Sequence, residues 1–359
     1  MYGSPDNTII TGNSSFVGGG GLYADAGTAL TLTNIRVSNN FGGAYALGPV
    51  TINDGTFTDN EGTGLYVSGT VSISGTGFFS NTAGGVGVLG AATVINSRFE
   101  NNTNLGGNPH DGGGLSVIGS LLLDGTDLIN NRAAGGGGGV YVVGSAALLG
   151  GIIEGNNSQY VGGGVYAPAI YDVDATYFST VTITGTVFAD NVALFAGGGI
   201  NVAGKTTIQN ALFVDNRSGG MFGGSGGGAQ VYGPLIVTAS SFISNSATAM
   251  AGAIYHGNVA DNAVGDGRIV NTVFARNHAN GDGAAIYINT DGTDVILHST
   301  IADTEINPKQ AIAVMTGTVG ITDTIITSHT VAISQTEGMV YQDYTSNGHK
   351  LRFFKQLEF

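Results

Sequence analysis

Apolar and small polar residues alternate in short stretches that recur along the whole chain. The segment Val71–Ser74, "VSIS", alternates with a period of two, which is typical of a strand that buries one face. A Gly-rich stretch followed by an apolar segment, such as "GGVGVL" at residues 84–89, recurs together with these alternating stretches. We therefore predict an all-β chain of short strands and tight corners, in which no helix is needed to connect the strands.

A second motif, Phe-x-x-Asn, marks one position in most repeats, and softer copies carry Val37, Leu128 or Ile153 in place of the Phe. Neighbouring copies are evenly spaced, since Asn60, Asn81 and Asn102 follow one another at intervals of 21 residues. An asparagine that recurs at one corner can stack on its copies and bond to them through its amide, so we predict a structural ladder and no catalytic role for these residues. The predicted ladder comprises Asn40, Asn60, Asn81, Asn102, Asn131, Asn156, Asn191, Asn216, Asn245 and Asn277.

The repeat length defines the expected fold. About 20 residues accommodate three short strands and three corners, so each repeat is one turn of a β-solenoid. We count about thirteen such turns in a single domain over residues 1–345, with the aliphatic residues of each strand and the Phe of the motif pointing inward. Residues 346–359 lack the repeat and are expected to form a C-terminal cap or tail, because a solenoid end exposes core and unpaired strand edges.

Composition narrows the classes of partner. A hydrophobic content of 42% is enough for a core and excludes a disordered chain, and 63 glycines fit a structure with many tight corners. The net charge of -14, with only 11 Lys and Arg, provides no basic face, so we expect no nucleic-acid partner. No apolar stretch has the length of a membrane helix, so we expect no membrane insertion by this chain. The absence of cysteine removes disulfides and thiolate metal ligands.

The paired Gly-Gly-Ala-Ile-like and Phe-x-x-Asn signals resemble the repeats of chlamydial polymorphic membrane proteins and related bacterial right-handed parallel β-helix proteins. The resemblance covers about residues 9–345 and implies the right-handed twist, which periodicity alone does not give. It also implies an extracellular or surface-displayed bacterial protein whose signal and anchor lie outside this chain, which would then be a segment of a longer protein. The group includes adhesins and passenger domains and shares its fold with pectate lyases, so it leaves the function open.

An outward column on the first strands of the turns is expected to carry tyrosine at seven of its thirteen positions. The purely structural interpretation is that the rings stack on one another on a β surface. The alternative is a binding platform for sugar rings or a partner protein, because tyrosine offers an apolar face and a polar tip. The candidate binding residues are Tyr23, Tyr45, Tyr66, Tyr141, Tyr166, Tyr255 and Tyr287.

Two long insertions between the first and second strands carry the other candidate residues. They span residues 168–180 and 256–268 and are expected to extend from the same edge of the solenoid, where they could wall a groove. Their acids are typical turn residues, but they could also bind calcium or serve a polysaccharide lyase. The candidates for the enzyme are Asp172, Asp174, Asp261, Asp266 and Arg268, and Asp172, Asp261 or Asp266 could bind calcium. His256 falls on an inward position, so we predict a buried or corner histidine.

The expected function is that of an adhesin-like scaffold that binds a glycan or a protein through its strand faces and loops. The tyrosine column contains no acid, Arg or Lys, whereas acid–base catalysis needs titratable groups within reach of one substrate atom, so the sequence favours a binding protein. The alternative is a polysaccharide lyase or another carbohydrate-active enzyme that uses the loop acids with calcium. No cofactor other than calcium is expected, and the sequence identifies neither a metal site nor an oligomeric state.

Overall fold

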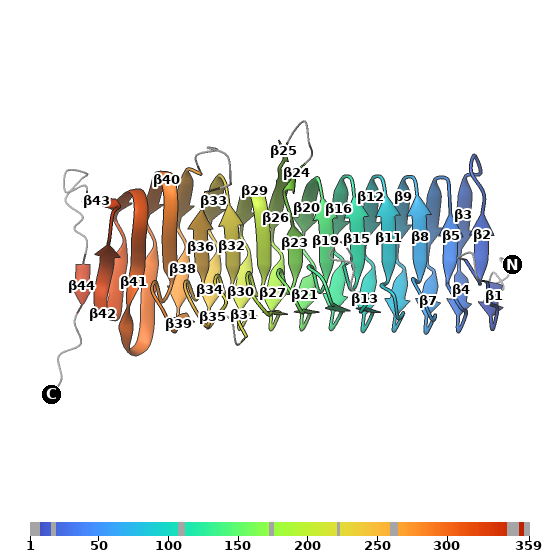
Figure 1. Cartoon of the computed structure of the whole chain (residues 1–359), viewed down its shortest axis with the longest axis horizontal. Helices are drawn as coiled ribbons and strands as arrows, with labels where there is room; N and C mark the ends of the chain where they lie inside the picture. The colour runs from blue at the N-terminus through green and yellow to red at the C-terminus, as the bar shows by residue number, and fades with distance from the viewer. Residues whose placement is uncertain are drawn as a thin grey trace, which may run out of the picture.

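The computed structural model describes residues 8–15, 19–106, 112–171, 176–220, 223–258, 265–342 and 352–354. These residues form a rod of parallel strands, with the chain advancing along the long axis from the blue N-terminal end to the red C-terminal end (Figure 1). The predicted all-β right-handed parallel β-helix is confirmed, and no helix occurs in this part of the chain. No helix that could cross a membrane is therefore found among the same residues.

Three columns of strands run along the rod, as the repeat predicts. The first column holds β2 (Leu22–Ala24), β5 (Ala44–Ala46), β8 (Leu65–Ser68), β11 (Val86–Leu89), β15 (Leu115–Ile118), β19 (Val140–Val143), β23 (Val165–Ala167), β32 (Ala229–Tyr232) and β36 (Ile254–Gly257). The second holds β3 (Leu30–Thr33), β6 (Val50–Asn53), β9 (Val71–Ser74), β12 (Ala92–Ile95), β16 (Leu121–Asp124), β20 (Ser145–Leu149), β26 (Ser179–Thr184), β33 (Leu235–Thr238), β37 (Gly267–Val270) and β43 (Met339–Gln342). Each strand pairs in parallel with the strands of adjacent turns.

The third column carries the Phe of the repeat. It holds β1 (Thr8–Thr11), β4 (Ile35–Ser38), β7 (Thr56–Thr58), β10 (Gly77–Phe79), β13 (Arg98–Glu100), β17 (Asp127–Ile129), β21 (Ile152–Glu154), β27 (Val187–Ala189), β30 (Leu212–Val214), β34 (Ser241–Ile243), β38 (Val273–Ala275) and β44 (Arg352–Phe354). Strand β44 falls in the predicted tail and pairs in parallel with the end of the solenoid. The other residues of that tail lie outside the described residues.

Four longer strands run across corners between columns. They are β29 (Ile200–Gln209), β40 (Ile286–Leu297), β41 (Thr300–Thr322) and β42 (Ile325–Gln335). Pairing of β41 with its neighbours contains register shifts, so the cycles near the C-terminal end are not separated by clear corners. The solenoid accordingly has about 12 turns, one fewer than the cycles counted in the sequence.

A fourth, narrow column was not predicted. Two-residue strands follow the ladder asparagine in the central turns and form a seven-stranded parallel sheet of their own. They are β14 (Thr103–Asn104), β18 (Arg132–Ala133), β22 (Asn157–Ser158), β28 (Val192–Ala193), β31 (Arg217–Ser218), β35 (Ser246–Ala247) and β39 (His278–Ala279). The asparagine corner of these turns is therefore a short strand in place of an irregular loop.

The core contains stacked phenylalanines from the third column. Phe78 lies between Phe57 and Phe99, with ring centroids 5.0 and 4.8 Å away, and all three side chains are fully buried. A second stack joins Phe188, Phe213, Phe242 and Phe274 at 4.6 to 5.3 Å. Burial of each ring contributes about 1.5–3 kcal/mol, and ordered stacking adds to this.

The asparagines of the repeat form a continuous hydrogen-bonded ladder inside one corner. Asn81 donates from Nδ2 to Asn102 Oδ1 (2.9 Å) and to the carbonyl oxygen of Phe57 (3.0 Å), and its backbone N–H also donates to Asn102 Oδ1 (3.1 Å). The same pattern joins successive turns from Asn40 to Asn277, and these side chains are almost completely buried. The residue before each of these asparagines turns the chain, as at Asp59, whose φ is 55°.

Candidate functional site

The strand register places all seven candidate tyrosines in one column on the first-strand sheet. Tyr23 is opposite Tyr45, which is opposite Tyr66. The column continues through Gly87, Ser116, Tyr141, Tyr166, Asn201, Gln230, Tyr255, Tyr287 and Ala313. Parallel strands repeat at about 4.8 Å, so neighbouring side chains of this column are within contact distance.

Three tyrosines at the N-terminal end form an ordered stack. The rings of Tyr23 and Tyr45 are 5.7 Å apart with an interplanar angle of 2°, and those of Tyr45 and Tyr66 are 4.9 Å apart at 14°. Burial, and after it the nearby hydroxyl of Tyr45, raise the pKa of Tyr66 above its ordinary value. Tyr66 therefore stays neutral at physiological pH and keeps its hydroxyl proton as a hydrogen-bond donor.

Further along the rod the column does not present an open aromatic surface. Tyr141 is only 1% exposed and meets Tyr166 edge to face, and Tyr287 is 4% exposed and stacks on Tyr255. Mutual stacking of the rings, the purely structural interpretation of the sequence pattern, thus describes much of the column. Tyr141 and Tyr287 are covered, so they do not offer the exposed rings that a platform needs.

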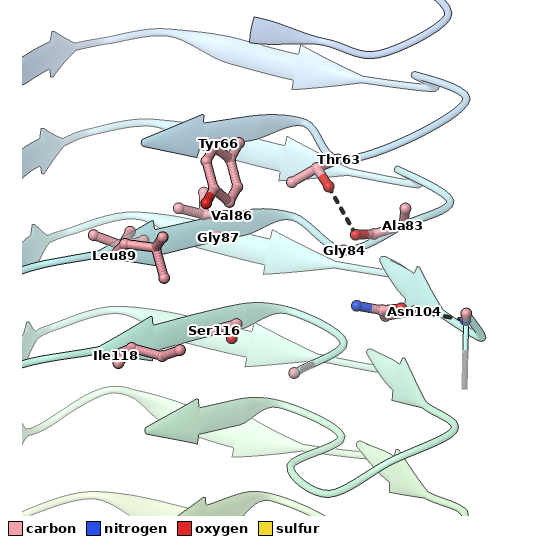
Figure 2. Close-up of a pocket in the computed structure, with 13 residues that line it drawn as sticks. Thr63, Tyr66, Ala83, Gly84, Val86, Gly87, Leu89, Asn104, Ser116 and Ile118 are labelled. Carbon is pink, nitrogen blue, oxygen red and sulfur yellow. Dashed lines mark hydrogen bonds between the residues drawn. The ribbon is translucent and has the colours of Figure 1, made fainter. Parts of the chain in front are cut away.

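A hollow about 520 Å³ in volume occurs where the column is interrupted (Figure 2). Gly87 and Ser116 occupy the two column positions between Tyr66 and Tyr141, so no ring fills this space. Tyr66 stands at one side of the hollow, and the exposed side chains of Leu89 and Ile118 lie along another (Figure 2). Thr63, Ala83, Gly84, Asn104, Gly106 and Gly112 line the side nearest the asparagine corner.

A second hollow of about 350 Å³ adjoins the first. The two share Thr63, Tyr66 and Ala83, and the second continues toward the N-terminal end past Tyr45 and Phe41. Phe41 is 46% exposed, so its ring forms an apolar rim at the corner. Together the two hollows make a groove that follows the rod axis beside the tyrosine stack, and we call it the tyrosine groove.

The loop candidates fall into two groups. Asp172, Asp174 and Asp261 lie outside the described residues. Asp266 and Arg268 are described and exposed, and Asp266 Oδ1 accepts a hydrogen bond from the backbone N–H of Thr293 in the next turn (2.8 Å). The described residues contain no group of three His, Asp or Glu that could hold a metal ion.

The insertion at residues 168–180 contains a short pair of antiparallel strands. Strands β24 (Ile170–Tyr171) and β25 (Thr176–Tyr177) pair antiparallel, and they project beyond the edge of the rod (Figure 1). Ser179 Oγ donates to the carbonyl oxygen of Pro168 (2.7 Å), which closes the base of this insertion. Because the insertion follows β23, it lies two turns beyond β15, the last strand that lines the tyrosine groove.

Two groups of buried, hydrogen-bonded polar side chains are only weakly indicated by the sequence. His256 is buried as predicted, but its partner Asp294 was missed, because the two residues are 38 positions apart in the chain. The second feature is a ladder of hydroxyls at another corner, where the backbone N–H of Thr76 donates to Ser97 Oγ (3.1 Å) and that of Ser97 to Thr126 Oγ1 (3.2 Å). A Ser or Thr two residues before the core Phe or Leu was the available signal.

No protein-family model matches the chain, and no curated protein sequence matches it significantly. The functional argument therefore depends on the geometry of the groove.

Proposed function

We propose that this protein is an adhesin-like scaffold, secreted by or displayed on a bacterial cell, that binds a glycan or a protein in the tyrosine groove. The observation that carries the proposal is the groove itself, which combines stacked tyrosines with an unfilled interruption of their column. A rigid solenoid suits this role, because its concave features are held by paired strands on both sides and lose little entropy when a ligand binds.

The proposed class is that of bacterial β-helix proteins with repeats like those of chlamydial polymorphic membrane proteins. The two recurring motifs support it, since the Gly-rich segment and the Phe-x-x-Asn segment occupy fixed corners of the turn. Extracellular location follows from this class, and surface proteolysis of intact cells of the source bacterium provides its test.

The polysaccharide lyase remains the alternative from the sequence, but no geometry among the described residues favours it. The described residues that line the tyrosine groove include one acid, Glu61, and no Lys, Arg or His that could act with it. Asp266 already accepts the Thr293 amide. We therefore propose binding without catalysis.

The test of the proposed function is binding of the intact protein to arrays of glycans and of host-surface proteins. Combined replacement of Tyr23, Tyr45 and Tyr66 by serine is expected to abolish the binding, since it removes the tyrosine stack, of which Tyr45 and Tyr66 line the groove. Tyr341→Ser is the matched control, because Tyr341 is 58% exposed on β43, far from the groove. A triple variant that is folded and binds as well as the intact protein would exclude the groove as the binding site.

A further inference from the structure

The break in the tyrosine column lies at a defined place. Tyr66 and Tyr141 are three turns apart, about 14 Å at the usual strand spacing, and Gly87 and Ser116 stand between them in register. Gly87 lies directly beneath the ring of Tyr66, because a Cβ atom on Gly87 would be 3.2 Å from Tyr66 Cδ2. The stack that begins at Tyr23 thus ends on a glycine, and the next ring position is open to the hollow.

We propose that this break is a subsite for one uncharged pyranose ring, belonging to a glycan that lies along the tyrosine groove parallel to the rod axis. The inference rests on the proposed function, which it narrows to neutral carbohydrate. The volume of about 520 Å³ falls within the range of small-molecule sites, roughly 300–1,000 Å³.

The lining has the two kinds of surface that a sugar ring requires. A pyranose has an apolar face of C–H groups and a rim of hydroxyls, and an aromatic side chain packs against such a face. Tyr66 supplies the aromatic wall, and Leu89 and Ile118, 45% and 44% exposed, supply apolar surface beside it (Figure 2). Thr63 Oγ1 donates to the carbonyl oxygen of Ala83 (3.0 Å) and thereby keeps lone pairs that can accept from a sugar hydroxyl.

The charge of the groove indicates whether it binds neutral or acidic sugars. Among the described residues that line the groove, Glu61 alone is charged, and the whole chain carries a net charge of -14. A uronate, sialate or sulfate would find no cation to pair with among the described lining residues, and it would be repelled by the field of the protein. The groove therefore favours an uncharged glycan.

Strand pairing argues against an extended peptide as the occupant. Peptides that bind β-structures commonly add a strand to an open sheet edge. The strands beneath the groove, β5, β8, β11 and β15, are each paired on both sides, so they have no open edge here. Recognition on this face depends on side chains and shape, which suits a chain of sugar rings.

The deciding variant is Gly87→Tyr. Gly87 lies in β11 without a positive φ, so a side chain there requires only that the Tyr66 ring shift by a few tenths of an ångström. A tyrosine at this position would continue the stack in register and fill the subsite. The probes are a panel of neutral oligosaccharides built from glucose, galactose, mannose and N-acetylglucosamine, and a matched panel carrying uronate, sialate or sulfate. The intact protein is expected to bind members of the neutral panel, and Gly87→Tyr is expected to weaken that binding at least tenfold while keeping or raising the melting temperature.

Controls make each outcome decisive. Ile236→Tyr adds a ring to an exposed position of β33 outside the groove and is expected to bind like the intact protein. If Gly87→Tyr does not fold, the pair Leu89→Ala and Ile118→Ala replaces it, since it removes the apolar wall and should also weaken binding tenfold. Neutral-glycan binding that neither change weakens would overturn the subsite and leave the proposed function standing. Preference for the acidic panel would overturn the inferred ligand class, and a blank response of the intact protein on all glycans would overturn both the inference and glycan binding.

Discussion

His256 Nδ1 lies 2.8 Å from Asp294 Oδ1, and both side chains are almost completely excluded from solvent. His256 Nε2 lies 2.8 Å from the carbonyl oxygen of Gly233, which can only accept, so this nitrogen carries a proton. Burial by itself lowers the pKa of His256, but the hydrogen bond and charge of Asp294, with smaller contributions from the Gly233 carbonyl and Asp266, outweigh it and raise the pKa above the ordinary value of 6.5. The geometry and the raised pKa both favour the protonated imidazole of His256 inside the rod.

Stability is expected to depend on pH through this pair. A histidine with a raised pKa in the folded state contributes stability that is complete below the unfolded pKa of about 6.5 and is lost as the pH rises through the folded pKa. The melting temperature should therefore fall over this range. His329 contributes in the opposite sense, because burial, partly opposed by Asp303, lowers its pKa. The pH dependence of the melting temperature is therefore measured for the intact protein and for the double variant His256→Val with Asp294→Val, and the difference between the two is assigned to the pair.

A change of one member of this pair should destabilise the protein more than a change of both. Asp294→Ala leaves the imidazole of His256 without its partner, and breaking a buried pair in this way costs about 3–5 kcal/mol, whereas replacing both members by apolar residues is often neutral. Positions in register with His256 carry Val231 and Ile288, so the turn accepts an aliphatic residue there. Melting curves and amide exchange of β36 and β37 measure the effect. A double variant that is less stable than Asp294→Ala would contradict this account.

Replacement of any asparagine of the ladder by alanine is expected to destabilise the protein. Asn102→Ala removes the Nδ2 bonds to Asn131 Oδ1 (3.0 Å) and to the Phe78 carbonyl (2.9 Å), and it leaves the donors of Asn81 without their acceptor. Each buried group left without a partner costs about 1–3 kcal/mol, so the total loss should be several kcal/mol. Asn280→Ala, at an exposed position, should change stability by less than about 0.5 kcal/mol. Chemical unfolding of both variants measures the difference, and equal losses would refute the ladder as a stabilising element.

The repeat made the solenoid predictable because each turn reuses one pattern. Phe78 and Asn81 are separated from their copies by a constant interval, so local alternation and period together specify strand, corner and inward face. The groove could not be predicted in the same way. It depends on Gly87 and Ser116 interrupting the column and on corner residues such as Asn104 approaching from a different part of the turn. Asp294 was missed for the same reason, since nothing near it in the chain indicates a buried partner.

The adjacent residues Phe78 and Phe79 provide a matched test of the core. Phe78 is fully buried between two rings, whereas Phe79 points to the opposite face of β10 and is partly exposed. Phe78→Ala should cost about 3–5 kcal/mol through lost burial and the cavity that remains, and Phe79→Ala much less. Phe78→Leu should be milder than Phe78→Ala, because Leu128 occupies the same column. Unfolding midpoints in denaturant rank the three variants, and a larger loss for Phe79→Ala would contradict the assignment of inward and outward faces.

Gly85 and Gly87 stand two positions apart near the start of the same strand, yet alanine should affect them differently. A Cβ atom on Gly85 would lie 2.6 Å from the carbonyl oxygen of Gly114, a backbone atom of the next turn that is fixed by strand pairing. A Cβ atom on Gly87 would meet the Tyr66 ring at 3.2 Å, and a side chain at the surface can shift by a few tenths of an ångström. Gly85→Ala should therefore cost about 1–3 kcal/mol, as overpacking does, and Gly87→Ala less than 1 kcal/mol. Thermal unfolding of the two variants distinguishes these outcomes. If Gly87→Ala were the more damaging change, the position beneath Tyr66 would be closed, and the room that a sugar ring needs there would be absent.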